Sequence, residues 1–333
     1  YYIENGMGKK YKPLAKIFAF FGVFVGLMGI GTFTQINGIS SATNNFFHGK
    51  NGTSIHIFGN EYSLVTIITG IIITLFVALV IIGGIKNISN VSQIIVPFMA
   101  VTYFIVTLAI LVYNFREIPN ALATIVQSAF GLRAVGGGAI GSMMMAMQMG
   151  VARGIFSNEA GLGSAPIAAA AAVADAPAQQ GLISMMGTFI DTIVICTMTG
   201  LTIVITGSWN IGLEGVSVTT RAFQMGLPLP AQFSSFILML CLVFFAFTTI
   251  LGWNYYSERC LEYIIGDKKN VIKAYKWLYI LCIFIGPFMT VSAVWTIADI
   301  FNGLMAIPNL IALIALNGVV VSETNKYLNS LKK

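Results

Sequence analysis

Long apolar runs recur along this chain and limit its fold more than any other feature. Eight of them occupy residues 14–42, 63–85, 91–113, 139–174, 179–205, 231–256, 277–295 and 299–321, with Asp299 and Asn302 marking a tight turn before the last. Each reaches the roughly 20 residues that a helix needs to cross a bilayer core of about 30 Å. Barrel strands would instead alternate apolar and polar residues over about ten positions. The sequence therefore predicts an all-α integral membrane protein, a polytopic helical bundle forming one domain over residues 1–333.

Charged residues are few and unevenly placed. They make up 9% of the chain, against about 25% in soluble domains. With the N-terminal segment on the cytoplasmic side, thirteen of the 18 lysines and arginines fall on cytoplasmic segments and four on the opposite side. Because basic residues favour cytoplasmic loops, we expect the C-terminus to be cytoplasmic. The net charge of +6 reflects this topology and does not indicate nucleic-acid binding.

Motifs of ATP-driven and hydrolytic proteins are absent from the sequence. It contains no nucleotide-binding loop, no Gly-x-Ser-x-Gly motif, no His-Glu-x-x-His motif and no cluster with the spacing of metal ligands. Each of these motifs places a phosphate, a nucleophile or a metal ion in a defined local structure. We therefore do not expect the protein to be an enzyme.

The apolar run over residues 139–174 is interrupted at membrane depth. Its middle carries Arg153 and Glu159 together with several glycines. Ionisable side chains inside a membrane are costly unless paired or hydrated, and they usually mark functional sites. We expect the helix to break over residues 153–159, with one half ending near Arg153 and the next capped by Ser157 or Asn158. The two facing helix ends carry partial charges of opposite sign and suit a small zwitterion.

Several other polar residues in the apolar runs are open to two interpretations. The charges of Arg153, Glu159 and Asp191 have two equally good explanations. They either form a structural ion pair, Arg153 with Glu159 or Asp191, or belong to a binding site. The adjacent Thr248 and Thr249 either bond the preceding turn of their own helix or offer oxygens to a sodium ion.

Two further apolar runs carry side chains that are not typical of a helix facing only lipid. The first run becomes polar in its second half, which includes Gln35, so one face must meet protein or a water-filled cavity. Trp253 lies one turn beyond Thr249 and is either a packing residue or an interfacial aromatic.

Residues 153–166 read RGIFSNEAGLGSAP and closely resemble the signature of the alanine or glycine:cation symporters. Flanking segments agree, including residues 136–141, 177–181 and 252–259, so the resemblance covers essentially the whole chain. It implies a fold similar to the leucine transporter, with eleven spans and two inverted repeats of five helices. On this resemblance the eight spans belong to an N-terminally truncated transporter domain, with three spans expected before Tyr1.

The resemblance also implies roles for individual residues. The pocket for a small amino acid would be lined by Gln35, Phe156, Ser157, Asn158 and Trp253, and sodium would be held by Phe245, Thr248 and Thr249. Phe156 and Trp253 would leave room only for a hydrogen or methyl side chain. Arg153, Glu159 and Asp191 would form a network around the helix break.

The resemblance implies a secondary symporter in the cell inner membrane that imports alanine or glycine with sodium by alternating access. Two alternatives stay open: a proton-coupled carrier, with Glu159 or Asp191 carrying the proton, and a membrane sensor or channel that does not transport. A channel would show a repeated polar stripe along a pore, and the sequence shows one broken helix instead. Beyond the amino acid, the ion and the surrounding lipid, we expect no obligate protein partner.

Overall fold

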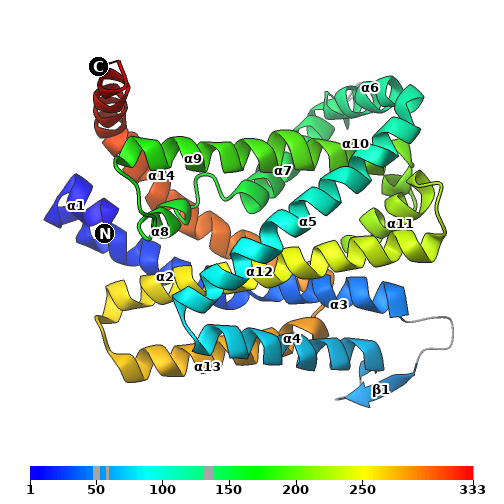
Figure 1. Ribbon diagram of the computed structural model, residues 1–333, viewed down its shortest axis with the longest axis horizontal. Helices are drawn as coiled ribbons and strands as arrows, with labels where there is room; N and C mark the ends of the chain where they lie inside the picture. The colour runs from blue at the N-terminus through cyan, green and yellow to red at the C-terminus, as the bar shows by residue number, and fades with distance from the viewer. Residues whose placement is uncertain (48–52, 58–59, 131–137, 333) are drawn as a thin grey trace.

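The computed structural model describes residues 1–47, 53–57, 60–130 and 138–332 and is built almost entirely from helices (Figure 1). The long helices are α2 (Lys12–Met28), α3 (Phe33–Phe47), α4 (Leu64–Ile82), α5 (Ile85–Tyr113), α7 (Gly138–Asn158), α12 (Ala231–Ile265), α13 (Lys269–Ile285) and α14 (Val291–Ser330). The shorter ones are α1 (Tyr2–Met7), α6 (Ile118–Ala129), α8 (Ala165–Ala169), α9 (Pro177–Phe189), α10 (Thr197–Ile205) and α11 (Val216–Gly226). Single turns and irregular helix occur at η1 (Lys9–Tyr11), η2 (Phe115–Glu117), η3 (Ile190–Cys196), η4 (Ser208–Asn210) and η5 (Gly286–Phe288). Strands β1 (Ser54–Ile57) and β2 (Asn60–Ser63) pair antiparallel, with Ser54 opposite Ser63.

Within the described residues, seven stretches of helix are long and apolar enough to cross a membrane. They are Lys9–Phe47, Leu64–Ile82, Ile85–Tyr113, Pro177–Ile205, Ala231–Ile265, Lys269–Phe288 and Val291–Ser330. This confirms the predicted all-helical, multi-pass membrane architecture. The predicted run over residues 139–174 is not one of the seven, and in the structure it is divided between the 21-residue α7 and the short α8.

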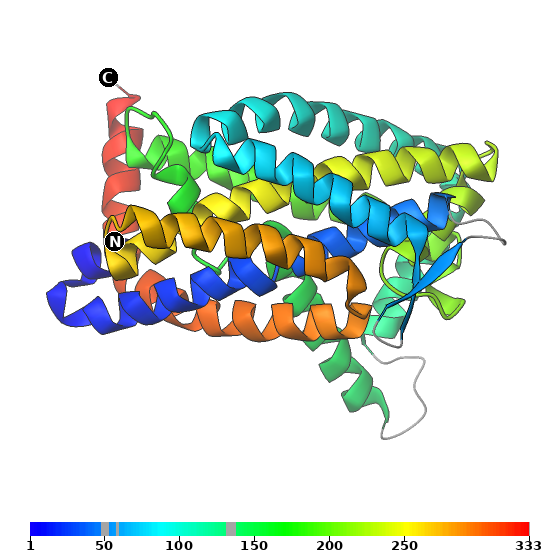
Figure 2. The same ribbon diagram turned by 90° about the horizontal axis from the view of Figure 1, so that it is seen from below.

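Helix α12 lies in the middle of the bundle, against α2 and α3 on one side and α5 and α11 on another (Figures 1 and 2). Small residues allow the close approach of α2 and α12. A Cβ atom added to Gly26 would lie 2.4 Å from the Cβ of Ser257, so only glycine fits there. Such small-residue contacts are common between membrane helices, where backbones pack closely.

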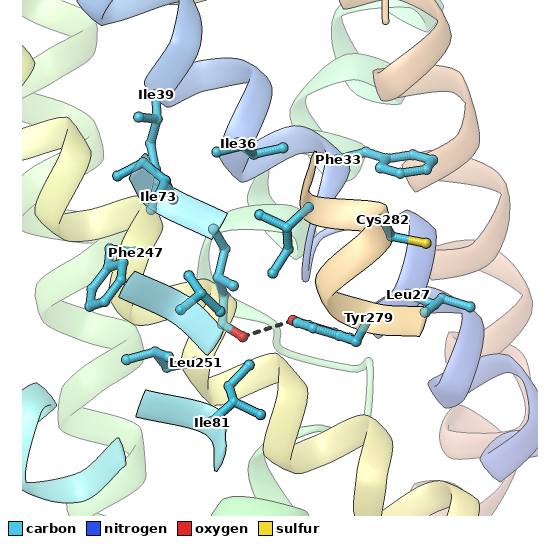
Figure 3. Packing of buried hydrophobic residues seen from close by; sticks show 14 of the residues in the cluster. Leu27, Phe33, Ile36, Ile39, Ile73, Ile81, Phe247, Leu251, Tyr279 and Cys282 are labelled. Atoms are coloured by element: carbon cyan, nitrogen blue, oxygen red, sulfur yellow. Dashed lines mark hydrogen bonds between the residues drawn. The ribbon is translucent and has the colours of Figure 1, made fainter. Parts of the chain in front are cut away.

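The largest apolar cluster joins α3, α4, α12 and α13, and Figure 3 shows it from close by. The fully buried Tyr279 lies within it and reaches two carbonyl oxygens, those of Ile250 at 2.7 Å and of Gly31 at 2.9 Å. Because a buried carbonyl without a partner is costly, this hydroxyl stabilises the segment between α2 and α3, where helical bonds are missing. Tyr279 thus connects α13 to α12 and to the interruption of the first apolar run.

Two helices are interrupted rather than one. The first apolar run divides into α2 and α3 at residues 29–32, with the Thr32 hydroxyl donating to the Leu27 carbonyl oxygen at 2.6 Å. The fourth run divides later than predicted. Helix α7 continues through Arg153 to Asn158, and the break lies over residues 159–164. The physical reason is the position of the residues with positive φ, which stand at Glu159 (56°), Gly161 (85°) and Gly163 (87°). Glycine adopts this conformation readily, so the helix ends there and not at Gly154.

The turn between the last two spans also lies elsewhere than predicted. Asp299 and Asn302 do not form it, because both stand inside the continuous helix α14. The turn is η5, where Pro287 removes a backbone donor and cannot continue helix α13. Helix α14 then begins with the Thr290 side chain accepting a hydrogen bond from the backbone N–H of Ala293. Two predicted spans, 277–295 and 299–321, therefore become α13 and the 40-residue α14.

Candidate functional site

A cavity of about 490 Å³ lies between α3, α5, α7, α11, α12 and α14. One part of its wall is polar and carries Thr34, Gln35, Asn37, Ser41, Thr199, Glu214, Ser217 and Thr219. The remainder is largely apolar and carries Tyr103, Phe156, Ile195, Leu238, Leu242, Phe245, Ala246, Val291, Val294 and Trp295. An apolar pocket with a few converging polar groups is the usual form of a small-molecule site.

The cavity brings together the two interrupted helices. Gln35 stands in the first turn of α3, and Gly38 and Ser41 continue the same face at helical spacing. Phe156 stands in the last turn of α7. Of the five residues predicted to bind substrate, Gln35 and Phe156 line the cavity. The Gln35 carboxamide forms no hydrogen bond with any residue that the structure describes, so it can bind a ligand.

Trp295 is a cavity residue that the sequence analysis missed. It lies on α14 beside Phe156, with ring centroids 4.6 Å apart and planes inclined by 45°. The Arg153 guanidinium lies over the Trp295 ring, 4.3 Å from its centroid, and forms an ion pair with Asp299. In the structure the partner of Arg153 is therefore Asp299, and not Glu159 or Asp191 as one of the two interpretations had it. Its partner stands one turn beyond Trp295 on α14, a helix that the predicted turn at Asp299 would have divided.

Ser157 and Asn158 connect α7 to the irregular helix η3. The Ser157 hydroxyl donates to Asp191 at 2.7 Å, and the Asn158 amide donates to the Thr192 hydroxyl at 2.8 Å. Neither residue is among those that line the cavity, and neither caps α8. The side-chain oxygen of Asn158, Oδ1, instead accepts from the backbone N–H of Ala160 at 2.9 Å. Segment η3 is a π-helix, a form that occurs frequently at functional sites.

Trp253 fixes the loop between α7 and α8. Its indole N–H donates to Glu159 at 2.8 Å, and the Ser164 hydroxyl donates to the second oxygen of the same carboxylate at 2.5 Å. Trp253 is 1% exposed and is not among the cavity residues, so its predicted role in limiting substrate size finds no contact in the structure. It lies on the face of α12 that carries Ala246, two turns farther along the helix.

A second side chain from another helix also holds this loop, and the sequence analysis did not identify it. The Asn309 amide of α14 donates to the Gly161 carbonyl at 2.8 Å, and its oxygen accepts from the Tyr2 hydroxyl at 2.5 Å. A Cβ atom at Gly163 would lie 2.9 Å from Asn309 and 2.6 Å from Phe18. An asparagine late in an apolar run is the signal that would have found it, since such amides usually bond a neighbouring helix in a membrane.

Thr248 and Thr249 bond their own helix, as one of the two interpretations predicted. The Thr248 hydroxyl lies 3.0 Å from the carbonyl oxygens of Phe244 and Phe245, and the Thr249 hydroxyl lies 2.9 Å from that of Phe245. Two hydroxyl oxygens and one carbonyl oxygen thus gather in one place. Uncharged oxygens are ligands that hard cations accept, so this donor set fits part of the shell of a sodium ion. A group of three or more acidic, histidine or cysteine ligands is absent from the described chain.

The cavity has one acidic side chain among its lining residues. Glu214 stands on the exposed loop before α11 and forms no ion pair with any described residue. No lysine or arginine lines the cavity. The formal charge of the lining residues is therefore −1, and Glu214 attracts the cationic group of a ligand rather than an anionic one.

Comparisons with known proteins place this geometry in context. The whole chain, residues 1–333, matches the family model described as the sodium:alanine symporter family. An uncharacterized transporter of Haemophilus influenzae is 49% identical over 334 residues, which cover 100% of this chain and 69% of that protein. The sodium/alanine symporter AgcS of Methanococcus maripaludis is 45% identical, with 99% and 67% covered. A sodium/proton-dependent alanine carrier protein of Bacillus sp. PS3 is 33% identical, with 83% and 64% covered. The chain thus spans about two thirds of the length of these relatives.

Proposed function

Because the chain belongs to the sodium:alanine symporter family, which is a family of transporters and not of enzymes, we propose that this protein carries alanine or glycine across a membrane together with sodium. The observation that carries the proposal is the meeting of Gln35 and Phe156, from two interrupted helices, in one cavity. Interrupted helices in transporters bind substrate and ion at their broken ends.

The lining of the cavity suits a small neutral amino acid. Its free Gln35 carboxamide and the Ser41 hydroxyl offer hydrogen bonds to a carboxylate. Glu214 offers the negative charge that an ammonium group prefers. Phe156 and its apolar neighbours leave a surface without hydrogen-bonding groups for a hydrogen or methyl side chain. An amino acid with a short side chain matches these three kinds of lining group, because its carboxylate meets the donors, its ammonium group meets Glu214 and its side chain meets the apolar surface.

We further propose that Thr248, Thr249 and the Phe245 carbonyl hold the sodium ion that is carried with the amino acid. The three oxygens lie on α12, and the Phe245 side chain reaches the cavity wall. Ion and amino acid would therefore share one helix, so occupation of one site affects the geometry of the other. This coupling is what a symporter requires, since two ligands influence each other only through a difference in contacts.

Alternating access requires two conformations of the protein. The helix interruptions over residues 29–32 and 159–164 would serve as hinges between them. The loop over residues 159–164 is held by side chains of α12 and α14 and contains three residues with positive φ. Halves of a broken helix reorient at such a loop without unmaking helical bonds elsewhere. We propose that the end of the bundle with α1 and the start of α13, together with the C-terminus, faces the cytoplasm across the cell membrane. The basic residues near α1 and α13, at one end of the bundle (Figure 1), support this orientation.

Proton coupling is a second candidate, and one observation favours it. The Glu159 carboxylate accepts from Trp253 and Ser164 but pairs with no lysine or arginine of the described chain. A carboxylate without a basic partner at membrane depth is a typical proton carrier. Proton flux into proteoliposomes during alanine uptake tests this candidate. Glu159→Gln should abolish the flux if Glu159 carries the proton, and Asp191→Asn tests the other acidic candidate in the same way.

Uptake of labelled alanine by proteoliposomes tests the function itself. An inward sodium gradient should accumulate alanine above its outer concentration, and an equal potassium gradient should not. Counterflow of labelled alanine into vesicles preloaded with alanine separates a carrier from a sensor or channel, because only a carrier exchanges substrate. Absence of both accumulation and counterflow would contradict the proposal.

A further inference from the structure

The wall that α14 gives to the cavity contains a large aromatic residue whose position is controlled from outside the cavity. Trp295 lines the cavity together with Val291 and Val294, which lie on the same helical face. Its ring packs against Phe156 of α7 with centroids 4.6 Å apart. Two aromatic rings from two helices therefore close this side of the cavity.

Arg153 and Asp299 determine where the Trp295 ring lies. The Arg153 guanidinium covers the ring at 4.3 Å from its centroid, a cation–π contact that tryptophan forms best among the aromatic residues. Asp299 stands four residues after Trp295, on the same face of α14, and pairs with Arg153. The pair thus draws the guanidinium toward α14 and over the ring. One buried nitrogen of Arg153, Nη1, has no hydrogen-bond partner in the described chain, so the ion pair and the ring are what hold it.

These contacts have no other evident task. Neither Arg153 nor Asp299 lines the cavity, and the two side chains are 37% and 39% exposed, so the ion pair alone contributes little to stability. The Arg153–Asp299 ion pair instead acts on the Trp295 ring, which lies between the pair and the cavity. A tryptophan that is fixed from behind has little freedom to turn away from a ligand, whereas an unfixed one would yield to a longer side chain.

We propose that Trp295 sets the upper size limit of the amino-acid side chain, with Arg153 and Asp299 as positioning residues. The inference rests on the proposed function, since it assumes that the cavity holds an amino acid. The expected magnitude follows from apolar pockets in general, where one methylene group changes discrimination by roughly 10- to 200-fold. A smaller ring at position 295 should therefore admit valine and leucine.

The test measures binding of glycine, alanine, valine and leucine to the purified full-length chain by thermal shift in sodium buffer. Trp295→Phe should raise the affinity for valine relative to alanine by about tenfold or more. Trp295→Tyr repeats the test if the first variant does not fold. The matched control is Trp277→Phe on α13, which changes an exposed tryptophan outside the cavity and should leave the ratio unchanged.

The positioning pair is tested by rescue. Asp299→Asn should shift the valine-to-alanine ratio in the same direction as Trp295→Phe, and Asp299→Glu should restore it, because glutamate keeps the charge. A purely structural role would lower stability without changing the ratio. Unchanged ratios in folded Trp295→Phe would overturn the inference. A wild-type chain that binds the amino acids without sodium-driven uptake would overturn the proposed function alone, and one that binds none of them would overturn both.

Discussion

Trp253 of α12 donates its indole N–H to the carboxylate of Glu159, with 2.8 Å between Nε1 and Oε1. The bond fastens the loop between α7 and α8 to the central helix of the bundle. Glu159 itself has a positive φ of 56°, which is unusual for a residue other than glycine. Such strained residues persist only where the surrounding structure holds them and are frequent at ligand sites.

Trp253→Phe should destabilise the protein because it removes the indole N–H donor and leaves part of the buried indole's space unfilled. Oε1 of Glu159 then loses its partner in a surrounding with little water, at a cost of about 1–3 kcal/mol. Thermal unfolding of the purified chain measures this loss. Trp277→Phe, which removes an exposed indole on α13, provides the comparison. Equal unfolding temperatures for the two variants would show that the Trp253–Glu159 bond contributes nothing to stability.

Gly163→Ala should also lower the unfolding temperature. The new Cβ would come within 2.6 Å of Phe18 and 2.9 Å of Asn309, and the φ of 87° is unfavourable for alanine. Strain of this kind costs on the order of 1–3 kcal/mol. Gly154→Ala is the matched control, because it stands inside α7 with no described atom within 4 Å of its added Cβ. There alanine should be neutral or stabilise by up to about 1 kcal/mol.

Thr249→Val should weaken the dependence of transport on sodium. Valine has nearly the same shape as threonine but lacks the hydroxyl oxygen that lies 2.9 Å from the Phe245 carbonyl. We expect the sodium concentration for half-maximal uptake to rise about tenfold, which corresponds to about 1.4 kcal/mol. Thr249→Ser retains the oxygen and should retain the sodium response. A Thr249→Val variant with the response of the wild type would remove this hydroxyl from the ion site.

Gln35→Leu should raise the KM for alanine without a matching loss of protein in the membrane. The carboxamide lines the cavity and has no hydrogen-bond partner in the described chain. Its loss should remove a hydrogen bond to the bound amino acid, worth about 1.5–3 kcal/mol when the ligand group is charged. Asn114→Leu, directly after the end of α5, is a comparison outside the cavity, since the Asn114 amide donates to the carbonyls of Ile110 and Gly226. It should reduce stability and leave the KM unchanged.

The sequence predicted the existence of the interrupted helix but not its boundaries. Charges and glycines in an apolar run predicted a break over residues 153–159, whereas in the structure it lies over residues 159–164. Glycines at positions 154, 161 and 163 look alike in the sequence, and only the packed structure decides which of them adopts a positive φ. The second interruption, over residues 29–32, was not predicted, because the polar half of the first run indicated only a face turned to protein or water.

The contacts around Arg153 could not be predicted, because they depend on how distant segments pack. Asp299 is 146 residues away in the chain and was expected in a turn. Trp295 was expected at the end of a span, on the other side of that turn. Once α14 is continuous, both residues fall on one helical face and meet Arg153 together. Gln35 and Phe156 were predicted by resemblance to a family, which carries information on tertiary structure that periodicity does not.

The central claim is that the cavity between α3, α7, α12 and α14 holds the amino acid, and a cysteine placed in it tests this directly. Gly38 lines the cavity, and a Cβ atom there meets its nearest neighbours at 3.8 Å, so Gly38→Cys fits. The background would replace the exposed Cys196 with serine. The account predicts that alanine with sodium slows alkylation of this cysteine by at least about tenfold, and that alanine in potassium buffer does not. Alkylation at the same rate with and without alanine and sodium would contradict it.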